Sequence, residues 1–146
     1  MREILFRGKS VNGTGWFEGS LRIVTIQPAD KEAFKQYEIE DTTLGVFPND
    51  FMAGFCEIVV PETVGQFTGL TDKNGKKIFE GDIIRATDSQ DADLVGMVVW
   101  RYEAWCVSGA NWADTLHMAN FLHKLVVIGN IHDNPELLNG GFEDEK

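Results

Sequence analysis

Short apolar runs that alternate with polar residues recur along the chain, separated by clusters of Gly, Asn, Asp and Pro. The clearest alternation lies in residues 15–26, where Phe17, Leu21 and Ile23 fall on one face. A repeat of two residues is the pattern of a strand with one buried face. The preceding segment VNGT (11–14) suits a hairpin connection, so we expect the chain to begin with two paired strands.

Similar apolar runs predict a series of further short strands. Together with the first pair, these lie at 3–9, 15–26, 55–60, 64–70, 77–79, 83–87, 96–101, 105–107 and 125–131. The segment DKNG (72–75) favours a tight β-turn, because Asn-Gly tolerates positive φ angles. The strand at 105–107 is expected to pair with 98–100.

The remaining segments are less regular. A helix is predicted over 114–124, with Asp114 as its N-cap and Lys124 in its last turn. Residues 31–37 fit either one helical turn or the approach to a strand, and both interpretations stay open. Residues 41–54 resemble a loop that carries aromatic side chains.

Many short strands joined by turns, with one short helix, predict a mainly β fold. We expect a small β-barrel or sandwich with an SH3-like C-terminal part. The N-terminal β lobe would span 1–60, and the C-terminal barrel lobe would span 61–146. One continuous domain is the alternative to these two lobes.

The charge balance constrains the partners. The chain of 146 residues carries 13 Lys and Arg against 23 Asp and Glu, a net charge of −10. Because nucleic-acid binding depends on neutralising phosphates, this balance disfavours binding over the whole surface. No apolar run approaches the length of a membrane span, and no secretory signal is recognised. We therefore expect a soluble, cytoplasmic protein without a membrane partner.

The residues usually responsible for metal or cofactor chemistry have the wrong spacing here. Cys56 and Cys106 form no CxxC pair. His117 and His123 would point about 120° apart on a helix, and His132 and Asp133 would face opposite sides of a strand. The 72–75 turn matches neither a calcium loop nor a phosphate loop. We expect no cofactor, no metal and no catalytic residue.

One basic cluster is a candidate nucleic-acid site. Basic residues near aromatic ones can hold a single strand by phosphate contacts and stacking. Three acids, Asp72, Glu80 and Asp82, lie among these basic residues and are expected to cancel most of the field, which favours an ordinary hairpin surface. The aromatic residues expected near them are Phe79 and, across the sheet, Trp100. The cluster consists of Lys73, Lys76, Lys77 and Arg85.

Residues 61–86, PETVGQFTGLTDKNGKKIFEGDIIRA, resemble the YopX family of phage and prophage proteins. REILFRGK (2–9), GWFEGSL (15–21) and VVIGNIHDNPELL (126–138) match the same family in the expected order. The resemblance implies a compact, mostly β protein with an SH3-like part and a bacteriophage or prophage origin. Compared with the shorter family pattern, residues 27–57 are an insertion in the N-terminal lobe. The resemblance implies no biochemical activity, so no catalytic residue is carried over.

These observations predict a non-enzymatic phage-derived accessory protein that binds another macromolecule in the bacterial cytoplasm. A protein is favoured over a nucleic acid as this partner. Nucleic-acid binding through the basic hairpin is the alternative, and a hydrolase-like enzyme that uses the acidic loop or the histidines is the third hypothesis. Phe47, Phe51 and the edge of a small sheet could also support self-association into a homo-oligomer.

Overall fold

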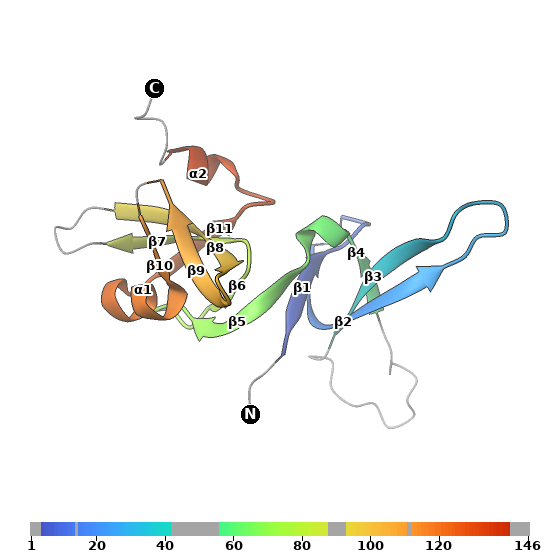
Figure 1. The fold of residues 1–146 in the computed structure, drawn as a ribbon, viewed down its shortest axis with the longest axis horizontal. Coiled ribbons are helices and arrows are strands. Elements are labelled where there is room, and N and C mark those ends of the chain that lie inside the picture. Colours follow the sequence, from blue (N-terminus) through green and yellow to red (C-terminus); the bar gives the residue numbers. More distant parts are fainter. Residues whose placement is uncertain (1–3, 14, 42–55, 88–92, 111, 141–146) are drawn as a thin grey trace. The chain divides into compact units, whose positions relative to one another are not determined.

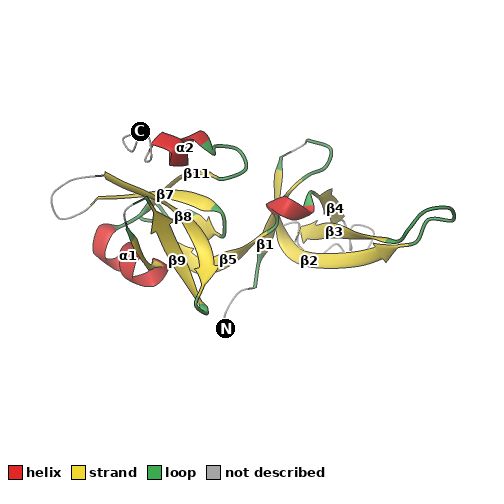
Figure 2. Cartoon of the chain, turned by 45° about the horizontal axis from the view of Figure 1, so that its top comes forward, coloured by secondary structure: helices red, strands yellow, loops and turns green. Residues whose placement is uncertain are grey.

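The computed structural model describes residues 4–13, 15–41, 56–87, 93–110 and 112–140, with only the backbone described for 121–123, 139 and 140. The chain divides into two compact units, Met1–Gln66 and Phe67–Lys146. Both units are built mainly from antiparallel strands, as Figures 1 and 2 show. The predicted mainly β fold class is confirmed.

The first unit contains four strands, one turn of 3-10 helix and the start of a fifth strand. These are β1 (Phe6–Lys9), β2 (Trp16–Ile26), β3 (Phe34–Asp41), β4 (Cys56–Val59), η2 (Pro61–Thr63) and β5 (Gly65–Thr71). The strand order is β4-β3-β2-β1-β5, with every neighbouring pair antiparallel.

The sheet of the first unit curls back on itself. An isolated bridge joins Ser10, just after β1, to Val59 of β4. The amide of Val60 also donates to the carbonyl of Lys9 at 2.8 Å. The unit is therefore barrel-like, with Ile39 and Val59 among its buried residues. Phe34–Asp41 settles the interpretation left open for 31–37, because pairing with β2 makes it a strand.

The second unit holds the rest of β5 and the remaining elements. These are β6 (Lys77–Phe79), β7 (Asp82–Thr87), β8 (Asp93–Arg101), β9 (Ala104–Gly109), β10 (Ala113–Thr115), α1 (Leu116–His123), β11 (Val126–Asn130) and α2 (Glu136–Gly140). Five strands form a sheet in the order β10-β9-β8-β7-β11. Helix α1 covers its core with Leu116 and Ala119, which are both fully buried.

Two elements of the second unit differ from the sequence prediction. Helix α1 is capped by Thr115, whose side chain accepts a hydrogen bond from the Met118 amide, and not by Asp114. The reason is that β10 extends through Thr115 by pairing with β9, which delays the helix start. Helix α2 follows Pro135, whereas the sequence predicted a single helix at 114–124. No helix in the described part of the chain is long and apolar enough to cross a membrane.

Candidate functional site

The turn between β8 and β9 holds two residues in an unfavourable backbone conformation. Arg101 pairs with Ala104, so Tyr102 and Glu103 form a two-residue connection. Their φ angles are 54° and 61°. Such turns normally carry Asn-Gly, because a left-handed backbone costs other residues about 1–2 kcal/mol each. The pairing of β8 with β9 must therefore hold Tyr102 and Glu103 in a backbone conformation that is unfavourable for these two residues.

The strained turn displays aromatic and cationic side chains. Trp100 and Trp105 are opposite each other across the two strands, with ring centroids 4.9 Å apart and planes at 73°. This edge-to-face geometry is favourable for aromatic pairs. Trp100 is 55% exposed and Tyr102 is 90% exposed, with exposed Arg101 between them. We call Trp100, Arg101, Tyr102 and Trp105 the aromatic tip.

The aromatic tip was missed as a site in the sequence. The predicted pairing of 98–100 with 105–107 is confirmed, and Trp100 was considered only as a neighbour of the basic cluster. A signal was available, since two tryptophans flank a connection that lacks Asn and Gly. Phe79, the other aromatic considered there, is only 2% exposed and cannot offer its ring for stacking.

All four members of the predicted basic cluster are exposed. Lys73 and Lys76 lie in the turn between β5 and β6, Lys77 begins β6, and Arg85 lies on β7. Of the three acids expected to cancel their field, Glu80 is exposed, whereas Asp72 and Asp82 are 6% and 1% exposed. Two of the expected opposing charges are therefore buried.

Asp72 is held by the backbone of two separate segments. Its Oδ1 accepts hydrogen bonds from the amides of Asn74 at 2.8 Å and Lys76 at 2.9 Å, and its Oδ2 accepts one from Val127 at 3.0 Å. Burial alone would raise the pKa of Asp72, but the three amide donors and the nearby charge of Lys76 outweigh burial and hold the pKa below its ordinary value.

The contact of the 72–76 turn with Leu125 brings a fifth basic residue, Lys124, to the cluster. The Lys73 amide donates to the carbonyl of Leu125 at 3.0 Å. Lys73 and Lys124 then line one open surface hollow of about 640 Å³, together with Thr71, Asp72 and Asn120. Nothing in the linear sequence pointed to Lys124, because it is separated from Lys73 by 50 residues.

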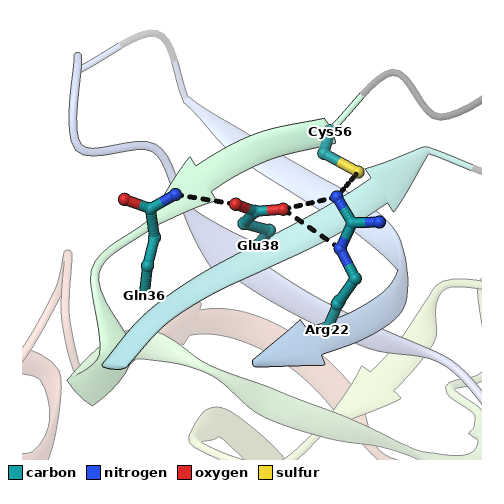
Figure 3. Close-up of polar contacts among 4 residues, drawn as sticks. All are labelled: Arg22, Gln36, Glu38 and Cys56. Atoms are coloured by element: carbon teal, nitrogen blue, oxygen red, sulfur yellow. Dashed lines mark hydrogen bonds and ion pairs between the residues drawn. The ribbon is translucent and has the colours of Figure 1, made fainter. Parts of the chain in front are cut away.

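A second polar cluster lies on the sheet of the first unit (Figure 3). Arg22 donates to Glu38 Oε1 at 2.7 and 3.2 Å, and Gln36 donates to Oε2 at 2.7 Å. Hydrogen bonds from Arg22 and Gln36 lower the pKa of Glu38. The Cys56 thiol accepts from Arg22 at 3.4 Å, yet burial raises its pKa, so the cluster does not activate a thiolate.

Metal-binding residues do not gather in the described part of the chain. No group of three or more His, Cys, Asp or Glu side chains there could hold a metal ion. His117 is exposed on α1 and His132 is half-buried after β11. The side chain of His123, most of the acidic loop 88–93, and Phe47 and Phe51 fall outside the described residues.

Comparison with known proteins identifies one similar structure and one matching family. Its fold is similar to that of protein EF1440 from Enterococcus faecalis, with 21% sequence identity, a TM-score of 0.51, and coverage of 94% of this chain and 99% of that one. No curated protein matches the sequence significantly. The family described as YopX protein matches residues 6–139. The chain therefore belongs to the YopX family.

Proposed function

We propose that this protein is a non-enzymatic interaction module, derived from a phage or prophage and acting in the cytoplasm of the bacterial host. Its partner is a protein, which the aromatic tip of the SH3-like second unit binds. The single observation that carries the proposal is the strained turn that presents exposed Trp100 and Tyr102 beside Arg101.

The composition of the aromatic tip supports a protein partner. Trp, Tyr and Arg are the residue types most enriched among side chains that dominate protein–protein binding energy. Aromatic rings contribute a large contact area and, with two side-chain torsions, lose little conformational entropy on binding. A hairpin whose strands hold its turn in place also needs little rearrangement to bind.

Backbone strain strengthens this argument. Non-glycine residues in the left-handed region persist where the surrounding structure determines them, and such residues cluster at functional sites. The β8–β9 turn could adopt the same geometry more favourably with Asn-Gly, so Tyr102 is not required by the fold. Its 90% exposure leaves the ring available for a partner.

The experiment is affinity capture from lysate of the bacterial host, with nuclease present, compared across matched variants. Wild type should retain a specific host or phage protein that Tyr102→Ala and Trp100→Ala each lose. Met118→Ala is the control, since Met118 is also an exposed apolar residue of the second unit, at 45%, and should retain the partner. A partner retained equally by all four proteins would overturn the proposal.

A second candidate function is binding of single-stranded nucleic acid by the basic cluster, here including Lys124. The observation that favours it is the exposure of all four residues of the basic cluster, with Lys124 lining the same hollow as Lys73. The carboxylate of Asp72 also lines this hollow and argues against it. Loss of Phe79 as a stacking ring argues against it. Phosphate contacts alone would give weak, strongly salt-dependent binding.

Salt titration of oligonucleotide binding tests this second function. The double variant Lys76→Glu/Lys77→Glu should weaken binding. It should also flatten the dependence of binding on salt, because fewer counterions are released when fewer phosphates are contacted. Lys31→Glu/Lys35→Glu in the first unit makes the same charge change and should bind as wild type does. If wild type binds neither single nor double strands at low salt, the basic cluster is an ordinary surface.

A further inference from the structure

The outer half of the β2–β3 hairpin extends beyond its neighbouring strands. Strand β2 pairs with β1 only through Trp16–Gly19, whereas it pairs with β3 from Gly19 to Ile26. Strand β4 reaches only Tyr37–Glu40 of β3. Within the described residues, the 20–26 segment of β2 therefore has a ladder partner on one side only. We call residues 20–36 the arm, and Figure 1 shows it as a two-stranded ribbon.

The arm exposes apolar side chains. Ile23 is 48% exposed and Phe34 is 50% exposed, and Val24 and Ile26 are only half-buried. A two-stranded ribbon is marginally stable in water, and a third strand with an apolar face is what stabilises it. The arm would therefore be stabilised by a strand added to its open edge.

The open edge of β2 lacks the features that normally prevent strand addition. Natural edges are protected by lysines, prolines, bulges or very short strands. Residues 20–26, SLRIVTI, contain one charge, Arg22, and no proline. Their pairing with β3 is continuous, without a register shift. Arg22 itself is engaged by Glu38 of the same chain.

We propose that a second copy of this chain occupies the edge, with the two β2 strands pairing antiparallel about a two-fold axis at Ile23. Ile23 then faces Ile23 of the second copy, Arg22 faces Val24, and Leu21 faces Thr25. The result is a continuous sheet in the order β3-β2-β2-β3. Because Tyr37 is the ladder partner of Ile23, one row across this sheet reads Tyr-Ile-Ile-Tyr.

The sequence of the edge selects this register. A two-fold axis perpendicular to the sheet must pass through a residue position, since only then do equivalent side chains stay on the same face. An axis at Arg22 would set two guanidinium groups opposite each other, which is destabilising. An axis at Val24 would place exposed Ile23 opposite Thr25. The axis at Ile23 pairs the exposed isoleucines and separates the arginines.

Sedimentation equilibrium of the full chain tests the dimer. Wild type should be dimeric, and Ile23→Lys should be monomeric because it sets two like charges at the axis. Phe34→Lys is the matched control, since it changes an equally exposed apolar residue of the arm on the strand away from the interface, and it should stay dimeric. Far-UV circular dichroism checks that both variants are folded. A monomeric wild type, or a dimer that survives Ile23→Lys, would overturn the proposal.

A disulfide trap tests the register independently. Opposed residues of antiparallel strands have Cα atoms about 4.5–5.5 Å apart, within reach of a disulfide. In a Cys56→Ser/Cys106→Ser background, Ile23→Cys should form a covalent dimer on oxidation. Val11→Cys, at a position 50% exposed in the same unit, should stay monomeric. Equal yields from the two positions would contradict the register. Neither experiment depends on the partner of the aromatic tip.

Discussion

Asp72 shows how a single side chain can connect distant segments. Its carboxylate accepts three backbone hydrogen bonds, two from its own turn and one from Val127 at the start of β11. Hydrogen bonds to a charged group contribute about 1.5–3 kcal/mol, more than neutral ones. Asp72 therefore fixes the position of Lys73 relative to Lys124 as well as the turn.

Replacing Asp72 by Asn should destabilise the protein by about 2–3 kcal/mol at neutral pH, because the Val127 amide would lose a charged acceptor and meet an amide nitrogen. Chemical denaturation measures the loss. Asp93→Asn, at an exposed position, is the control and should change stability by less than about 0.5 kcal/mol.

The pH dependence of stability should also report the contribution of Asp72. The pKa of Asp72 is lower in the folded chain than its ordinary value, so the unfolded chain binds this proton more readily. Its contribution is therefore fully present above the ordinary pKa and is lost as the pH falls through the lower, folded pKa. Asp72→Asn should flatten the acid limb of a stability–pH curve. Parallel acid limbs in wild type and variant would contradict this role.

At the two residues of the β8–β9 turn, stability and the proposed binding favour different side chains. The double change Tyr102→Asn/Glu103→Gly should stabilise the protein by about 1 kcal/mol, because both residues then tolerate positive φ. The same variant removes the exposed ring and should lose the partner. Thermal unfolding measures the first effect and affinity capture the second. A destabilised variant would show that the turn is not strained.

At the scale of elements, β1 and β4 approach each other closely in the first unit. A Cβ atom at Gly8 would lie 2.8 Å from the Cβ of Val59, which is itself buried. Gly8→Ala should therefore cost about 1–3 kcal/mol through overpacking. Val59→Ala should cost about 2 kcal/mol by leaving a cavity.

Combining the two changes tests the contact. The methyl group added at Gly8 fills part of the space that Val59→Ala leaves, so the double variant should be at least about 1 kcal/mol more stable than the sum of the single effects. Chemical denaturation of the four proteins gives this coupling. Strict additivity would show that the two positions do not meet.

Elements set by local pattern could be predicted from the sequence. The hairpin turn at 72–75 and the pairing of Trp100 with Trp105 follow from Asn-Gly chemistry and from alternating apolar residues. The helix cap could not be located, because the pairing of β10 with β9 decided between Asp114 and Thr115. Local propensity does not contain that pairing.

At the scale of the whole molecule, the candidate sites depend on contacts between distant segments. The burial of Asp72 requires an amide donor 55 residues away, and Lys73 shares a hollow with Lys124 from a distant segment, so neither feature could be predicted from the sequence. The aromatic tip was hidden for another reason. Two tryptophans around a connection without Asn or Gly marked the position in the sequence, but the exposure of Tyr102 follows only from the turn geometry.

The molecule also combines opposite electrostatic features. Its net charge is −10, whereas Lys73 and Lys124 line one hollow in the second unit. Overall negative charge opposes non-specific approach of nucleic acid. This balance favours a protein partner and makes the aromatic tip the central surface of the proposed function.

The most direct test of that claim is quantitative capture of partner from nuclease-treated host lysate by wild type and by Tyr102→Asn/Glu103→Gly. We expect this variant to keep the fold and to gain stability, and thermal unfolding of the same preparation checks that lost binding is not due to unfolding. We predict a protein that co-purifies with wild type in a fixed ratio and is absent from the variant. The same protein in the same ratio with both would contradict the role of the aromatic tip.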